Sequence, residues 1–302
     1  MSFSVLAVVG PTASGKSDLG ISIAKAIGKA EIVNADAMQL YRGMDIGTAK
    51  LTKQARADIP HRLIDAVTPD QELTAVDYSK LAQAAIREIL DRGNTPIVVG
   101  GSMFYVAAAL DELDFAPTDE IVRERLEAEA DSFGALALHE RLGRLDPQSA
   151  ERIPAQNVRR VVRALEVIEL TGAPHKSSLP EPQYLMPTLQ LGIEVDRELL
   201  KERIRIRVER MWEAGLLDEV QGLIDSGVSF SRTAAVAIGY AQARAQLAGE
   251  FSQAEAIEQT ISLTNRYARR QMSWFRRDSR IKWLDSSGNL ENQALEQIRL
   301  GR

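Results

Sequence analysis

The strongest constraint on the fold is a phosphate-binding loop close to the start of the chain. Residues 10–17 read Gly-Pro-Thr-Ala-Ser-Gly-Lys-Ser, which fits the Walker A pattern of two glycines, a lysine and a hydroxyl residue. The apolar run "SVLAVV" (4–9) before it is typical of a buried parallel strand, and apolar residues at helical spacing follow it. A strand, a glycine-rich loop and a helix in this order predict a loop that wraps a ligand containing pyrophosphate.

Each position of the loop has a chemical reason. Backbone N–H groups would face phosphate oxygens, Lys16 would neutralise their charge, and the hydroxyl of Ser17 would bind Mg²⁺. Thr12 and Ser14 either add hydroxyl donors to the phosphates or are small residues that permit the turn. The predicted diphosphate site consists of Gly10, Thr12, Ala13, Ser14, Gly15, Lys16 and Ser17. The loop alone does not identify the reaction, and ATPases and nucleotide kinases carry it most often.

The first part of the chain alternates strand and helix patterns. Apolar runs rich in β-branched residues occur at 31–36 and 95–101, and an amphipathic helix pattern at 77–93 lies between them. This alternation predicts an α/β fold with a doubly wound parallel sheet, here a P-loop NTPase-like core.

After about residue 112 the strand pattern stops. The segment 116–187 has a charged, helical pattern and ends in a proline-rich connector at 176–187. One strand at 188–195 precedes long helices that continue to the end. We therefore expect a core formed by 1–115 and 188–302, interrupted by an α-helical insert at 116–187.

Composition excludes several classes of protein. The chain has no cysteine, so disulfides, thiolate catalysis and cysteine metal sites are excluded. No run approaches the roughly 20 apolar residues that a membrane span needs, and the first residues show no basic leader. We expect a cytoplasmic protein that works with oxygen and nitrogen chemistry.

An aspartate follows the second predicted strand. Asp36 stands where ligands of open α/β sheets bind. Its carboxylate could bind Mg²⁺, act as a base, or cap a helix that begins at Ala37.

The run "DAMQLYRGMDIGTAK" (36–50) resembles the signature of the tRNA dimethylallyltransferases, also called tRNA isopentenyl transferases. Five further blocks resemble the same family in the same order, at 59–65, 99–105, 157–167, 237–240 and 267–276. The resemblance spans residues 5 to about 285. It implies transfer of a dimethylallyl group from dimethylallyl diphosphate to N6 of the adenosine 3′ of the anticodon in tRNA, by a monomer that needs Mg²⁺ and no membrane.

The resemblance also implies roles for individual residues. Lys16 and the loop would stabilise the leaving diphosphate, and Asp36 matches the catalytic aspartate that orients N6 and accepts its proton. The positions that match tRNA contacts of the family are Asp36, Ala37, Met38, Gln39, Ser102, Arg123, Arg159, Arg160 and Arg163. Alternatives stay open for three of them. Gln39 could only cap local backbone, Ser102 could only complete a strand-to-helix turn, and Arg123 could belong to a solvated helix face.

A basic segment lies near the end of the chain. Residues 266–283 carry seven arginines and lysines against one aspartate, interleaved with Tyr267, Trp274, Phe275 and Trp283. Phosphate attraction and base stacking favour RNA binding by such a segment. The alternative is a basic amphipathic helix whose aromatic side chains belong to the core.

Four positions depart from the family pattern, among them Met103 and Phe104, where Gly-Leu is common. Ala37 stands where many members have serine, and Val236 stands where many have glutamine or arginine, so the resemblance implies no polar contact from either. Three rival functions remain: an adenylate isopentenyltransferase acting on a free nucleotide, a P-loop nucleotide kinase, and a non-catalytic RNA-binding protein that uses the loop as a nucleotide switch. The helical insert and the basic segment favour tRNA as the acceptor.

Overall fold

The computed structural model describes residues 3–174 and 181–301. The chain forms two compact units, a larger one from residues 1–112 and 183–302 and a smaller one from 113–182. The sequence expectation placed both boundaries of the insert a few residues later, and the first part of its proline-rich connector lies outside the described residues. The chain leaves and re-enters the larger unit at one place, because Glu112 N–H donates to the carbonyl oxygen of Gln183 at 2.8 Å.

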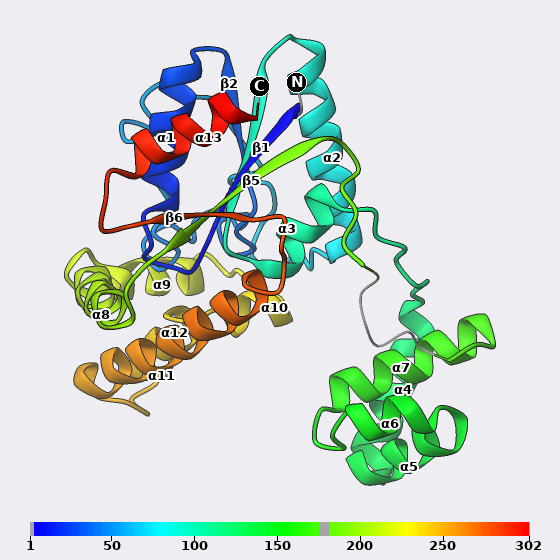
Figure 1. The fold of residues 1–302 in the computed structure, drawn as a ribbon. Coiled ribbons are helices and arrows are strands. Elements are labelled where there is room, and N and C mark those ends of the chain that lie inside the picture. The colour runs from blue at the N-terminus through cyan, green and yellow to red at the C-terminus, as the bar shows by residue number, and fades with distance from the viewer. Residues whose placement is uncertain (1–2, 175–180, 302) are drawn as a thin grey trace. The chain divides into compact units, whose positions relative to one another are not determined.

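A six-stranded parallel sheet with the order β3-β2-β4-β1-β5-β6 forms the centre of the larger unit (Figure 1). Its strands are β1 (Val5–Val9), β2 (Ala30–Asn34), β3 (His61–Arg62), β4 (Thr95–Gly100), β5 (Thr188–Glu194) and β6 (Lys282–Asp285). The central strands are buried along nearly their whole length. Burial on both faces explains why they read as continuous apolar runs.

The expectation of a single strand after the insert was wrong. β6 begins at the end of the basic segment (266–283), after α12 (Gln253–Phe275), and pairs in parallel with β5, with Leu191 opposite Lys282. Only four residues long, it has too little alternation to be recognised, and its pairing partner lies far away in the sequence.

Helices cover both faces of the sheet, α1 and α13 on one side and α2 and α3 on the other (Figure 1). A further group, α8, α9, α11 and α12, packs together beyond the carboxyl ends of the strands (Figure 1). Besides α12, the helices of this unit are α1 (Lys16–Ile27), α2 (Ala75–Asp91), α3 (Met103–Leu110), α8 (Arg197–Glu213), α9 (Leu216–Asp225), α10 (Arg232–Ala235), α11 (Tyr240–Leu247) and α13 (Leu290–Leu300).

The local sequence accounts for several helix ends. α2 begins with a capping box in which Thr74 and Asp77 bond each other's backbone N–H groups, and α12 begins with the same arrangement of Ser252 and Glu255. α1 turns its apolar stripe, including Leu19 and Ile23, into the core. None of the helices in the described ranges combines the length and apolar composition that crossing a lipid bilayer requires.

The smaller unit is helical, as expected for the insert. It contains α4 (Glu120–Phe133), α5 (Ala135–Leu145), α6 (Pro147–Arg152) and α7 (Val158–Thr171). These helices enclose an apolar core of their own, which includes Leu126, Leu142 and Val161. The unit therefore has an independent source of stability.

Candidate active site

The phosphate loop (residues 10–17) is curled by three residues with positive φ. These are Gly10 at 145°, Ala13 at 62° and Gly15 at 91°, directly before α1. Such a curl turns successive N–H groups to one side, where the amino end of a helix also favours negative charge. Ser14 is buried, and its hydroxyl has no hydrogen-bond partner within the described part of the chain. An anion in the loop would supply the missing partner.

Lys16 is the central cation of the loop. Its ammonium donates to the carbonyl oxygen of Pro11 at 2.6 Å. Desolvation lowers the pKa of Lys16 to about 8, the Asp36 carboxylate opposes this shift, and repulsion from Arg207 adds to it. A bound diphosphate would compensate the desolvation and favour the charged form of Lys16.

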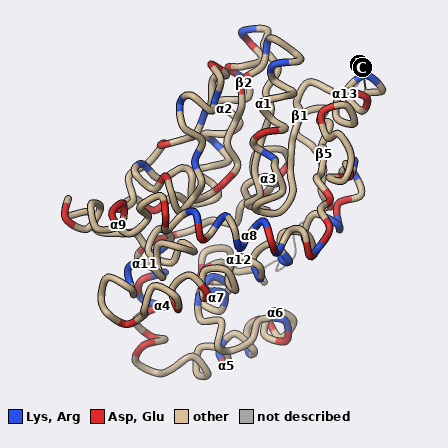
Figure 2. Tube along the Cα trace, turned by 90° about the vertical axis from the view of Figure 1, so that its left-hand side faces the viewer, with Lys and Arg blue, Asp and Glu red and all other residues tan. Residues whose placement is uncertain are grey.

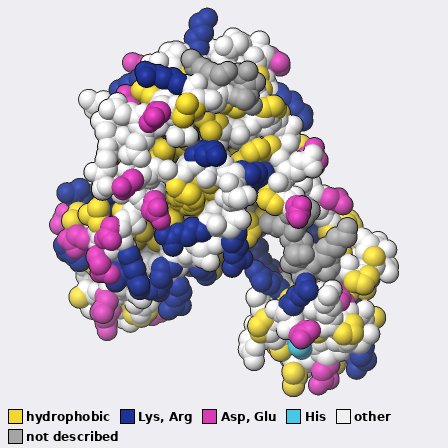
Figure 3. Space-filling model, viewed as in Figure 1, with side chains coloured by type: hydrophobic (Ala, Val, Ile, Leu, Met, Phe, Trp, Pro, Cys, Tyr) yellow, Lys and Arg dark blue, Asp and Glu magenta, His cyan; other side chains and the backbone are white. Residues whose placement is uncertain are grey.

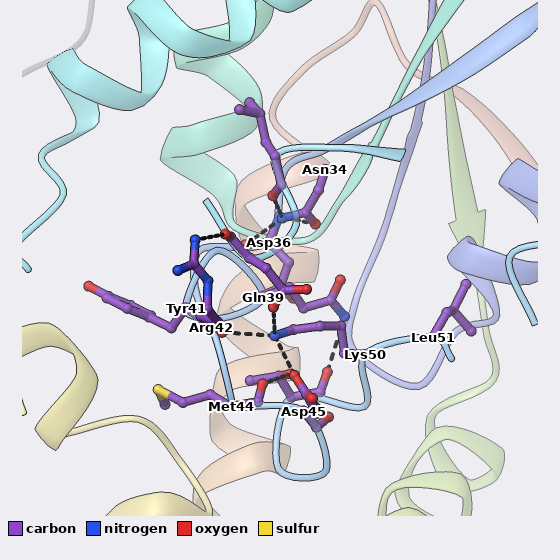
Figure 4. Close-up of polar contacts among 12 residues, drawn as sticks. Asn34, Asp36, Gln39, Tyr41, Arg42, Met44, Asp45, Lys50 and Leu51 are labelled. Atoms are coloured by element: carbon purple, nitrogen blue, oxygen red, sulfur yellow. Dashed lines mark hydrogen bonds and ion pairs between the residues drawn. The ribbon is translucent and has the colours of Figure 1, made fainter. Parts of the chain in front are cut away.

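Asp36 lies just past the carboxyl end of β2, in a tight turn (Figure 4). Its Oδ1 accepts from Met38 N–H at 3.0 Å, and its own N–H donates to Asn34 Oδ1 at 3.1 Å. The carboxamide of Asn34 also donates to the carbonyl oxygens of Asp36 and Leu63, at 3.0 and 2.9 Å. No helix begins at Ala37, so the helix-cap alternative was wrong, although Asp36 does cap the local backbone through one oxygen.

The loop of residues 36–50, named here the acceptor loop, is organised around the ammonium of Lys50 (Figure 4). Lys50 donates to Tyr41 O at 2.8 Å and forms ion pairs of 2.6 Å with Asp45 and Asp65. The side chain of Lys50 is 3% exposed, whereas those of Asp45 and Asp65 are 58% and 39% exposed, so water reaches the carboxylates but hardly the lysine. Gln39 also serves the loop, because its Nε2 donates to Thr48 O at 3.1 Å.

Two side chains from the distant helices hold the acceptor loop. Glu219 of α9 accepts from the N–H groups of Asp45 and Ile46, at 3.1 and 2.8 Å. Tyr240, the first residue of α11, donates to Glu219 and accepts from Gly47 N–H. A Cβ on Gly47 would lie 2.4 Å from the Tyr240 ring, so this contact requires glycine. Sequence reasoning included Tyr240 in a family block but missed this role for both side chains.

Ser102 joins the turn after β4 to the turn after β2. Its Oγ accepts from Ala37 N–H at 2.9 Å. The two turns approach so closely that a Cβ on Gly100 would lie 2.2 Å from Ala35 O. The glycines before Ser102 are therefore explained by the close approach of the two turns, as the strand-to-helix alternative predicted. Ser102 in addition positions the backbone beside Asp36.

A cleft of about 760 Å³ opens at the phosphate loop. Besides Lys16 and Ser17, its lining includes Arg203, Arg207 and Arg210 of α8. Arg207 donates to Thr48 O at 3.3 Å, and desolvation lowers its pKa against the attraction of Asp36. Sequence reasoning missed these arginines; the available signal was their spacing by four and three residues along a helix.

The donors at the phosphate loop suit Mg²⁺. Across the described ranges, no group of three or more His, Asp or Glu side chains could hold a metal ion. Mg²⁺, however, commonly binds one or two protein oxygens together with substrate phosphates. The hydroxyl of Ser17 and the carboxylate of Asp36 are hard oxygen donors of this kind.

The predicted arginines of the smaller unit divide into two pairs. Arg123 and Arg163 form ion pairs of 3.1 and 2.9 Å with Glu166, which is fully buried. Burial opposes ionisation of Glu166, but hydrogen bonds from Thr118 and Arg163 hold its pKa below the usual value. Arg159 and Arg160, in the first turn of α7, are exposed.

The basic segment is also divided. Arg280 pairs with Asp111 and Asp278, both at 2.7 Å, and Arg276 pairs with Glu194 at 2.9 Å. Phe275 is buried, so the core alternative holds for this aromatic side chain. Exposed arginines remain at 266, 269, 270 and 277.

The tube view marks many charged residue positions along α8 and α12 (Figure 2). In the space-filling view, Lys and Arg side chains gather over the region of the larger unit that these helices form (Figure 3). Basic surface in an otherwise acidic chain is the electrostatic requirement for binding a nucleic-acid backbone.

Val236, which stands where many family members have glutamine or arginine, is 71% exposed.

Comparisons with known proteins agree with this geometry. The family model for IPP transferase matches residues 39–278. The chain is 50% identical over 296 residues to a tRNA dimethylallyltransferase of Salinispora tropica, covering 98% of this chain and 92% of the relative. It is 53% identical over 284 residues to that of Thermobifida fusca, covering 93% and 89%.

Two solved structures resemble the fold. The full-length tRNA isopentenylpyrophosphate transferase of Bacillus halodurans has a TM-score of 0.71 and 37% identity, covering 98% of this chain and 95% of that one. A eukaryotic dimethylallyltransferase acting on tRNA has a TM-score of 0.79 and 26% identity, covering 96% and 77%.

Proposed function

The chain belongs to the IPP transferase family, and from this premise we propose that it transfers a dimethylallyl group from dimethylallyl diphosphate to N6 of the adenosine 3′ of the anticodon in tRNA. The observation that carries the proposal is the arrangement at the carboxyl edge of the sheet. There the phosphate loop with Lys16 lies close enough to Asp36 for their charges to interact. A leaving-group site and a carboxylate base therefore share one edge.

The leaving group is the diphosphate. When the allylic C–O bond breaks, the electron pair stays on diphosphate oxygen and positive charge develops on the allylic carbon. Loop N–H groups, Lys16 and Arg207 stabilise the departing anion, the kind of electrostatic contribution that is commonly the largest in catalysis. Mg²⁺ held by Ser17 and by phosphate oxygens would neutralise further charge on the diphosphate.

The acceptor is the exocyclic nitrogen of adenine. N6 forms the new C–N bond to the allylic carbon and loses one proton. Asp36 accepts this proton: Oδ1 is engaged by Met38 N–H, which fixes the carboxylate, and Oδ2 has no hydrogen-bond partner within the described ranges. Because the base must leave its stack to reach this carboxylate, the target adenosine is turned out of the anticodon loop.

Contacts to tRNA divide by position. Asp36, Ala37, Met38, Gln39 and Ser102 surround the extruded base, while in the smaller unit Arg159 and Arg160 bind backbone phosphates. Arg123 and Arg163 contribute to the same surface while paired with Glu166. The enzyme works in the cytoplasm as a monomer, where tRNA and dimethylallyl diphosphate are its partners.

The test is a direct assay of the product. Purified protein is incubated with Mg²⁺, dimethylallyl diphosphate and unmodified tRNA with adenosines in its anticodon loop, and nucleosides are analysed by mass spectrometry. AMP serves as a parallel acceptor. We expect the adduct on one tRNA adenosine, next to the anticodon. An adduct on AMP alone would show that the acceptor is a free nucleotide and not tRNA. No adduct on either acceptor would indicate that the phosphate loop binds the phosphates of a nucleotide, as in a kinase.

A further inference from the structure

A buried glutamine bridges two loops of the active site. Gln271 of α12 is 1% exposed. Its Oε1 accepts from Thr12 N–H of the phosphate loop at 2.9 Å. Its Nε2 donates to Gly101 O, in the turn after β4, at 2.7 Å. The carboxamide therefore uses its acceptor on one loop and its donor on the other, and this fixes its orientation.

The atoms around the Gln271 carboxamide are closely packed. A Cβ on Gly101 would lie 2.5 Å from Gln271 Nε2 and 3.0 Å from Gly10 O, so the turn needs glycine at this position. The same site would be 3.4 Å from the ammonium of Lys16. Tyr267, one helical turn earlier on α12, has its hydroxyl beside Ser102 and Gln271. One face of α12 thus packs on both loops.

Through Gln271, a chain of contacts connects the diphosphate-binding loop with the backbone beside Asp36. On one side, Thr12 belongs to the loop that holds the diphosphate. On the other, Gly101 precedes Ser102, whose Oγ holds the N–H of Ala37 next to Asp36. β1 and β4 are neighbours in the sheet, but hydrogen bonds between their strands do not determine how the loops beyond them are spaced.

We propose that Gln271 is a positioning residue that sets the distance between the diphosphate and the base Asp36. The inference rests on the proposed prenyl transfer. Attack by N6 on the allylic carbon requires donor and acceptor to meet in a near-attack geometry, and a displacement of about 1 Å can lower the rate roughly 100-fold. Gln271 contacts loop backbone on both sides and does not supply a proton or charge.

Gln271→Met tests the proposal, because methionine has a similar length and volume without either hydrogen bond. Gln271→Glu retains an acceptor for Thr12 N–H but places a carboxylate against the Gly101 carbonyl. The matched control is Gln259→Met, which makes the same change at an exposed position of the same helix. Steady-state kinetics give kcat and the KM values for dimethylallyl diphosphate and tRNA, and calorimetry with inorganic pyrophosphate gives the fraction of binding-competent protein.

For Gln271→Met we expect kcat per binding-competent enzyme to fall about 100-fold, with both KM values changed by less than about threefold. For Gln271→Glu, kcat should fall at least as much, and for Gln259→Met, kcat and both KM values should equal those of wild type. Three results would each overturn the proposal: an unchanged kcat, an increase in KM without a fall in kcat, or a fall in activity no larger than the fall in the fraction of binding-competent protein. Wild type inactive on tRNA would instead refute the proposed function, so the two failures are distinguishable.

Discussion

The phosphate loop follows β1 and the acceptor loop follows β2, two strands separated by β4 in the sheet, and the two loops obtain their shapes differently. The phosphate loop is curled by its own residues, with positive φ at Gly10, Ala13 and Gly15, and leads directly into α1. The acceptor loop has internal bonds from its own Lys50 but is also held from outside, by Ser102 and by Glu219 and Tyr240, which lie far along the chain. The proposed reaction needs both loops, and on that proposal the distant helices would belong to the active site.

The largest effect should come from the acceptor side. Asp36→Asn keeps an oxygen for Met38 N–H but cannot accept a proton, so kcat should fall about 1,000-fold, within the range of general-base catalysis. Filter binding should show tRNA affinity within a few-fold of wild type. A comparable loss of tRNA affinity would move Asp36 from catalysis to recognition.

Lys16→Ala tests the phosphate loop in the same way. Removing the cation that faces the diphosphate should lower kcat about 100-fold or more, as for other groups that stabilise developing negative charge. The affinity for pyrophosphate, measured by calorimetry, should also fall while tRNA affinity is retained. Loss of tRNA affinity without loss of pyrophosphate affinity would contradict this division of roles.

The lowered pKa of Lys16 predicts a pH dependence. In the proposed reaction Lys16 binds the diphosphate as a cation, and without the ligand its pKa is lowered by desolvation to about 8. Pyrophosphate affinity should therefore decline as the pH rises above about 8, by up to tenfold per unit. Lys16→Arg, which stays charged, should remove this decline if it binds at all. A wild-type profile that is flat between pH 7 and 9.5 would contradict the assignment.

Glu219→Ala tests the external support of the acceptor loop. The N–H groups of Asp45 and Ile46 would lose their acceptor, which should lower the free energy of unfolding by about 1–3 kcal/mol. The altered loop should lower kcat/KM roughly tenfold. Urea unfolding and kinetics measure both, and Asp218→Ala, an exposed neighbour, is the control. Equal behaviour of the two variants would mean that the acceptor loop holds its shape alone.

The smallest effect is expected in the smaller unit. Changing Arg159 and Arg160 together to alanine should weaken tRNA binding several-fold and reduce the slope of log affinity against log salt by up to about 2. The control is Arg144→Ala, an exposed arginine of α5. Arg163→Ala should instead lower the melting temperature, because it leaves the buried Glu166 with fewer partners. An unchanged salt slope in the double variant would exclude phosphate contacts there.

Several features could be read from the sequence because they depend on neighbouring residues. The Walker A spacing, the buried strands before and after it, and the helical insert each arise within a window of about 20 residues, where periodicity and turn chemistry act. The position of Asp36 followed from its place after a strand, because parallel strands bring their carboxyl ends to one edge.

Other features depend on pairs that no local pattern connects. Glu219 meets Asp45 across 174 positions, and Gln271 meets Thr12 across 259. β6 is four residues long and forms because β5 offers an unpaired edge. Arg123 and Arg163 look like surface cations in sequence, but the fold brings the buried Glu166 between them.

The sequence by itself thus determined the central strands of the sheet, the phosphate loop and the place of Asp36 directly after a strand, because local sterics and apolar periodicity act over short stretches of chain. Only the tertiary structure decided which side chains hold the acceptor loop, which arginines of α8 reach the cleft and how Gln271 joins the two loops. These are contacts between distant segments, and their geometry exists only once the helices have packed on the carboxyl edge of the sheet.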